Sequence, residues 1–135
     1  MNNSNSNSNS NSNRKFSEEG RQSVRTYSSI KSCTADFCLI PIGGDDGSSV
    51  GRYIAECQRV LEKTGLEYKL HGYGTGIEGD WDEVMSAIKA CHQAVHDMGC
   101  PRVATDIRIG TRMDKKSSLD LKVKSVENHL SNNQK

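Results

Sequence analysis

The 135-residue sequence lacks both an excess of charge and a long apolar run, and each absence excludes a class of protein. Its 18 lysines and arginines are balanced by 17 aspartates and glutamates, so net charge gives no reason to expect a nucleic-acid partner. No apolar run approaches the roughly 20 residues that a membrane-spanning helix needs, so no membrane partner is expected.

Paired cysteines are missing too. The five cysteines are odd in number, form no CxxC motif and follow no secretory signal, which together indicate a reducing compartment. Their spacings fit no standard zinc site. Cys57 and Cys91 fall on the apolar faces of predicted helices, where a small buried thiol is the ordinary interpretation. We therefore expect no metal site.

Apolar residues are scarce in the first part of the chain, which begins with alternating Ser and Asn. Such a segment has nothing to bury and is predicted to be disordered. We expect a disordered leader over residues 1–32, one folded domain over residues 33–131 and a disordered tail over residues 132–135. The folded part is long enough for one modest hydrophobic core.

The leader also bears on location. The stretch "RTYSS" is similar to a mitochondrial processing site, but Glu18 and Glu19 count against a transit peptide, and the Asn-Ser start is not amphipathic. A cytoplasmic location is expected, with a mitochondrial one as the alternative.

The folded part alternates between the apolar spacing of strands and that of helices. Strands are predicted over residues 34–42, 66–71, 75–78 and 102–109, and helices over residues 50–61, 81–95 and 119–130. The order β-α-β-β-α-β with a further C-terminal helix is that of the ferredoxin-like α+β fold. We expect a four-stranded antiparallel sheet in the order 4-1-3-2, with two helices packed on one face.

Two helices cover only one face of such a sheet. The other face is left with apolar residues of the first strand, either Ile40 and Ile42 or Phe37 and Leu39, depending on which parity points outward. Uncovered apolar residues favour self-association.

The stretch "HGYGTGIEGDWDEV", residues 71–84, combines four glycines with four carboxylates. Asp80 followed by Glu83 resembles a capping box, which predicts a helix beginning at Trp81. Asp82 and Glu83 lie in the first turn of that helix, where negative charge complements the helix dipole. Only the fourth carboxylate, Glu78, has no structural role in this interpretation.

Other candidate sites are weaker. "PIGGDDGSSVG" lies between a strand and a helix start but lacks the Gly-Lys-Ser/Thr ending of a P-loop. Ser48 or Ser49 could cap the helix, and the hydroxyl left free could contact a ligand. His92 and His96 have the i, i+4 spacing of a metal clip but lack the Glu of an HExxH motif, so a solvated flank is favoured. No nucleophile motif is present, so no catalytic residue is predicted.

Three motifs carry a resemblance to a known family. "PIG…SSV…YIAE", "GTGIEGDWDEV" and "IRIGTRMDK" are similar, in order and spacing, to the small thiamine-binding-protein family of ferredoxin-like fold. The resemblance covers about residues 34–131. It implies a cytosolic homotetramer, some of whose relatives bind thiamine or its hydroxymethylpyrimidine part. The sequence departs from the family pattern at Gly72-Tyr73, where Pro and an aliphatic residue or Met are commoner, and at Gly76, where a branched apolar residue is usual; both departures are expected beside the pocket.

The chemistry of thiamine agrees with residues of the glycine-rich stretch. A binding site needs polar groups for the aminopyrimidine edge, an aromatic ring for stacking and a carboxylate for the thiazolium cation. Tyr73, Thr75 and Glu78 offer these groups, with Ser48 and Ser49 as additions. We expect a non-catalytic binder of thiamine or a related pyrimidine that requires no cofactor; the alternative is a structural homotetramer without a high-affinity ligand.

Overall fold

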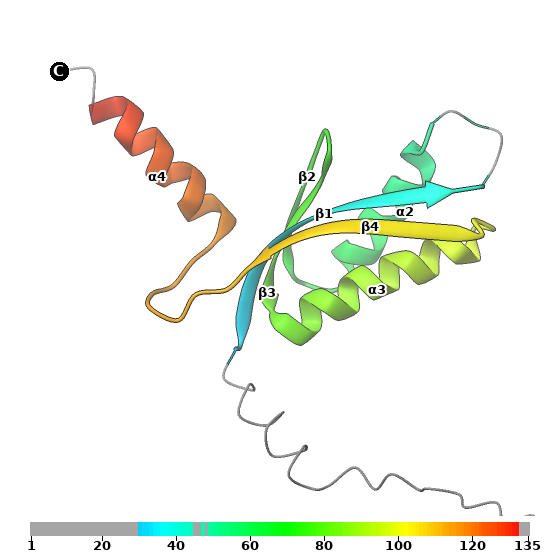
Figure 1. The fold of residues 1–135 in the computed structure, drawn as a ribbon, viewed down its shortest axis with the longest axis horizontal. Helices are drawn as coiled ribbons and strands as arrows, with labels where there is room; N and C mark the ends of the chain where they lie inside the picture. The colour runs from blue at the N-terminus through cyan, green and yellow to red at the C-terminus, as the bar shows by residue number, and fades with distance from the viewer. Residues whose placement is uncertain (1–29, 45–46, 48, 133–135) are drawn as a thin grey trace, which may run out of the picture.

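The computed structural model describes residues 30–44, 47 and 49–132. Within these residues four strands and three helices follow one another in the expected order (Figure 1). They are β1 (Ser32–Ile42), α2 (Gly51–Glu62), β2 (Glu67–His71), β3 (Gly74–Asp80), α3 (Trp81–Asp97), β4 (Arg102–Gly110) and α4 (Leu119–Asn132). The strand order is β2-β3-β1-β4, and all three neighbouring pairs are antiparallel. The predicted ferredoxin-like fold and its 4-1-3-2 order are confirmed.

The ends of the folded part differ slightly from the predicted domain. β1 begins at Ser32 and α4 ends at Asn132, one residue beyond each expected boundary. Residues 1–29 and 133–135, which make up most of the predicted leader and tail, lie outside the described residues. Among the described residues, no helix combines the length and the apolar character needed to cross a membrane.

The hydrophobic core lies between the sheet and the helices α2 and α3, which pack side by side against one face (Figure 1). Phe37 and Leu39 are buried and point toward the helices, so Ile40 and Ile42 are the residues of β1 that point outward. The buried apolar residues are Cys33, Ala35, Phe37, Leu39, Tyr53, Cys57, Leu61, Ile77, Val84, Ala87, Ile88, Cys91, Val95 and Cys100. The buried residues of α3 form one apolar stripe, and the prediction that Cys91 lies on it is confirmed.

The two helices meet at a pair of cysteines. Cys57 of α2 and Cys91 of α3 are almost fully buried, and the Cys91 thiol lies 3.8 Å from the Cys57 carbonyl oxygen, to which it donates. Contact with the Cys57 thiol, together with burial, raises the pKa of the Cys91 thiol, so Cys91 stays protonated. All five cysteines are free.

The starts of the two core helices differ in their capping. The Asp80 carboxylate accepts from the backbone N–H groups of Asp82 at 2.9 Å and Glu83 at 3.2 Å, which confirms the predicted cap of α3. The N-cap residue of α2 is Val50, which makes no side-chain capping bond, so the predicted serine cap is wrong. Ser49 only accepts from the N–H of Gly51 at 3.3 Å, because it stands one position too early.

The second face of the sheet, called here the open face, is largely uncovered. Ile40 and Ile42 lie on it, each more than one third exposed. α4 leads away from the sheet and buries none of its residues (Figure 1). The expectation of an uncovered face needs one correction, because Leu119 at the start of α4 lies against Gly76 of β3.

The cap of α3 yields a test of this geometry. We expect Asp80→Ala to lower the free energy of unfolding by about 0.5–2 kcal/mol, because two N–H groups lose their acceptor. Asp82→Asn, which affects only the helix dipole, should cost about 0.3–1 kcal/mol. Urea unfolding at one fixed protein concentration measures both. Equal stability of Asp80→Ala and the parent protein would contradict the assignment of the cap.

Candidate functional site

A pocket of about 180 Å³ lies between α2, β1 and the β2–β3 hairpin, and we call it the hairpin pocket. Apolar side chains form much of its wall, among them Phe37, Ile54 and Leu70. Its volume is below the roughly 300–1,000 Å³ of pockets for drug-sized ligands. A space of this size suits one small ring better than a molecule of two rings.

Two polar side chains meet in the wall of the hairpin pocket. Thr75 is only 3% exposed, and its Oγ1 accepts from Nε2 of Gln58 at 3.1 Å. This bond leaves the Thr75 hydroxyl proton and Oε1 of Gln58 without a partner among the described residues. The pocket wall therefore holds one donor and one acceptor that have no partner among the described residues, on a surface that is otherwise mostly apolar.

Sequence reasoning identified Thr75 but missed Gln58. The buried stripe of α2 consists of Tyr53, Cys57 and Leu61. Gln58 stands one position after Cys57 and four after Ile54, at the edge of this stripe. An uncharged polar residue at that position, among charged ones on the solvent face, was the available sign.

The remaining predicted residues are spread around the molecule. Tyr73 lines the hairpin pocket from the hairpin turn, where it is 91% exposed. Ser49 is exposed and does not line the pocket. Ser48 lies outside the described residues. Of the predicted ligand-binding residues that the structure describes, the hairpin pocket thus brings together only Tyr73 and Thr75.

Glu78 lies on the opposite face of the sheet from Thr75. The two residues are three positions apart in β3, and successive side chains of a strand point to opposite faces. One Glu78 carboxylate oxygen accepts from the backbone N–H of Leu119 at 2.6 Å. The carboxylate without a role in the sequence interpretation therefore binds the first turn of α4.

Glu78 belongs to a wide groove of about 770 Å³ between the open face and α4. Its floor holds an ion cluster in which Asp36 accepts from Nη2 of Arg108 at 2.7 Å and contacts Nε2 of His71 at 2.5 Å. Nδ1 of His71 accepts from the N–H of Tyr73 at 3.3 Å. Because Nδ1 accepts, the proton of a neutral His71 sits on Nε2, which donates to Asp36.

The charge state of the cluster follows from its geometry. The hydrogen bond from Arg108, helped by His71, holds the pKa of the Asp36 carboxyl below its ordinary value, although burial acts in the opposite direction. Asp36 is therefore ionised at neutral pH.

His92 and His96 each lie against a hydrogen-bonding group of the chain. Nε2 of His92 lies 2.6 Å from Oγ1 of Thr105, and Nδ1 of His96 lies 2.8 Å from the Cys100 carbonyl oxygen. Burial is the larger cause that lowers the pKa of His92, and the charge of the nearby His96 is the smaller one. In the part of the chain that the structure describes, no three His, Cys, Asp or Glu residues form a group able to hold a metal ion.

A family model described as that of a thiamine-binding protein matches residues 35–127, which is more than half of the chain. The chain belongs to this thiamine-binding-protein family. The resemblance inferred from the three motifs is thereby confirmed.

Relatives in the family are found in distant organisms. A UPF0045 protein of Synechocystis sp. is 50% identical over 111 residues, which cover 81% of this chain and 90% of that protein. A solved structure of a Methanocaldococcus jannaschii protein has 31% identity and a TM-score of 0.66, covering 73% of this chain and 98% of that one. A Thermotoga maritima structure, of a protein proposed to act in thiamine biosynthesis or salvage, has a TM-score of 0.59 over 70% of this chain and 98% of that one. Its identity of 18% supports the fold alone.

The Asp36 cluster gives a pH-dependent test. The folded-state pKa of Asp36 lies below its ordinary value of 3.8, so its contribution to stability is present above about pH 4 and is lost as the pH falls through the folded-state pKa. We expect the advantage of the parent protein in unfolding free energy over Asp36→Asn to decline progressively as the pH falls from about 5 towards the lowered folded-state pKa. Urea unfolding at several pH values measures the difference. The matched control is Asp106→Asn, because Asp106 lies on the same face of β4 as Arg108. An advantage of the parent protein over Asp36→Asn that stayed constant across this range would contradict the prediction.

Proposed function

We propose that the chain binds thiamine or a related pyrimidine in the hairpin pocket, without catalysing a reaction. The observation that carries this proposal is the free donor of Thr75 beside the free acceptor of Gln58. An aminopyrimidine edge presents a ring nitrogen that accepts and an exocyclic amine that donates. Thr75 would donate to the ring nitrogen, and Oε1 of Gln58 would accept from the amine.

The pocket's size supports binding of the pyrimidine part. About 180 Å³ lined mainly by apolar side chains accommodates one ring. The rest of a thiamine molecule would then extend past the hairpin turn, where Tyr73 offers an aromatic face to the thiazolium cation. Hydroxymethylpyrimidine, which lacks the second ring, is therefore a ligand that the pocket can hold in full.

Two further observations support a binder over an enzyme. A threonine nucleophile needs an adjacent base, whereas the partner of Thr75 is the Gln58 amide, which does not take up a proton. The family match also points to thiamine as the class of ligand.

Five free cysteines are compatible with a cytoplasmic protein, which is the location that we propose.

Thr75→Val tests the binding proposal while keeping the shape of the side chain. Because the hydroxyl donor is lost and Gln58 loses its acceptor, we expect affinity for hydroxymethylpyrimidine to fall by about 1–3 kcal/mol. Glu78→Gln, on the opposite face, should leave the affinity unchanged, in contrast to the expectation from sequence. Isothermal titration of the three proteins with thiamine and hydroxymethylpyrimidine measures this. Failure of the parent protein to bind either compound at millimolar concentration would refute the proposal.

A second candidate function is that of a self-assembling scaffold, and α4 favours it. Leu121, Val123, Val126 and Leu130 are all more than half exposed, although the last three continue one apolar stripe. An isolated helix of 14 residues is marginal in water without a partner for its apolar face. We propose that a second copy of the chain covers this stripe within a homotetramer. The two functions are compatible, because the hairpin pocket lies on the other face of the sheet.

Charge placed on the stripe tests the assembly. We expect the double variant Val123→Asp and Val126→Asp to lower the molar mass measured by light scattering, because buried carboxylates disrupt an apolar interface. Ser125→Asp, on another side of α4, is the matched control and should leave the mass unchanged. A parent protein that is monomeric at micromolar concentration would rule out the tetramer.

A further inference from the structure

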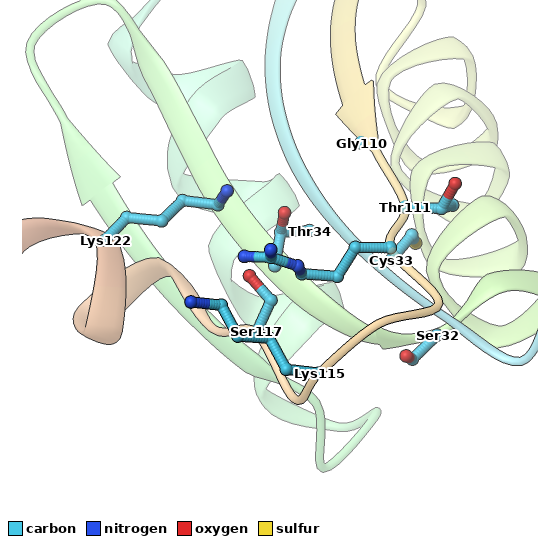
Figure 2. Close-up of a pocket in the computed structure, with 9 residues that line it drawn as sticks. Ser32, Cys33, Thr34, Gly110, Thr111, Lys115, Ser117 and Lys122 are labelled. Atoms are coloured by element: carbon cyan, nitrogen blue, oxygen red, sulfur yellow. The ribbon is translucent and has the colours of Figure 1, made fainter.

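A third and smaller cavity of about 70 Å³ lies where the loop after β4 passes the start of β1. Figure 2 shows the side chains of Lys115, Lys122, Thr34 and Ser117 turned toward a common space. Arg112 also lines this cavity, which we call the basic cavity. Along β1 its Thr34 is four residues, or roughly 13 Å, from Cys38 in the hairpin pocket, so the two sites are separate.

The cations of the basic cavity are only partly neutralised. Arg112 forms a two-pronged pair with Asp114, with Nε to Oδ1 at 2.7 Å and Nη2 to Oδ2 at 2.6 Å. This pair fixes the guanidinium in the loop and leaves three of its five N–H donors for another acceptor. Lys115 and Lys122 form no salt bridge among the described residues, although, after the hydrogen bond from Arg112, the charge of Lys115 helps to lower the pKa of Asp114. Three cations therefore face one carboxylate.

A neighbouring lysine of α4, Lys124, forms a salt bridge within the helix. Lys124 lies 2.6 Å from Asp120, one helical turn away, and does not line the basic cavity. Lys122, two positions earlier, lies where the wide groove meets the basic cavity, and its side chain extends toward the cavity (Figure 2). At the start of α4 the backbone N–H groups of Leu119 and Leu121 already donate to side-chain oxygens, so neither serves as a donor to the site.

We propose that the basic cavity binds a phosphate group, either free or at the end of a small phosphorylated molecule. A compact tetrahedral anion suits a cavity of about 70 Å³. Its oxygens would accept from the guanidinium of Arg112, from the ammonium groups of Lys115 and Lys122, and from the hydroxyls of Thr34 and Ser117. This set of donors at one small cavity is chemically specific for a compact, multiply charged anion.

The test uses the full-length protein at constant ionic strength in chloride buffer. Isothermal titration with inorganic phosphate and with glycerol phosphate should give saturable binding of at least one of them. Binding of glycerol phosphate assigns the site to phosphorylated molecules, and binding of inorganic phosphate alone assigns it to the free ion. Lys122→Gln should weaken this binding about tenfold or more, since a charge-assisted bond is lost.

The control is Lys124→Gln, which removes the same charge from the same helix outside the cavity and should change the affinity less than about twofold. Circular dichroism establishes that both variants fold. Absence of saturable binding by the parent protein at millimolar phosphate would overturn the proposal. An equal loss in Lys124→Gln would also overturn it, because the effect would then be one of general charge. Both results are independent of pyrimidine binding, which is measured at Thr75.

Discussion

The glycines on either side of Thr75 in β3 determine how both faces of the sheet are built. A side chain at Gly74 would place its Cβ 2.7 Å from the Phe37 carbonyl oxygen, so β1 and β3 could not approach as they do. One at Gly76 would place its Cβ 2.8 Å from a methyl group of Leu119. Since both glycines point to the open face, β3 carries almost nothing there, while Thr75 and Ile77 fill the helix side. Gly74, Thr75 and Gly76 therefore supply both the buried hydroxyl of the hairpin pocket and the flat surface on which α4 begins.

This division separates two kinds of chemistry. The helix side is buried and mostly apolar, and a hydroxyl–amide pair there is strong because few other polar groups compete with it. The open face is exposed and charged, and Asp36 reaches His71 there because the intervening strand contributes only glycines between them. A neutral aromatic ligand suits the first environment, and a charged group or another protein surface suits the second.

Much of the fold was predictable because it depends on local patterns. The alternation of β1, the spacing of the α3 stripe and the carboxylate of Asp80 each specify structure over a few residues. The site was less predictable, because it depends on how distant elements face each other. Gln58 could be assigned to the edge of an apolar stripe, but its contact with Thr75 joins residues 17 positions apart. Glu78 was a different case: had residues 75–78 been treated strictly as a strand, parity alone would have separated it from Thr75.

The position of α4 illustrates how one residue can alter the surface of a conserved fold. The resemblance to the family places a branched apolar residue where this chain has Gly76. A single methyl group there could be accommodated by rotation of the Leu119 side chain, whose terminal methyl is the atom in contact. A larger branched group would need more room, and the bond between Glu78 and the Leu119 N–H limits how far the first turn of α4 can move to provide it. Gly76 and Glu78 therefore act together: the glycine provides the space, and the carboxylate fixes the helix start within it. The direction of the exposed apolar stripe, and with it the surface available to a second copy, follows from this pair.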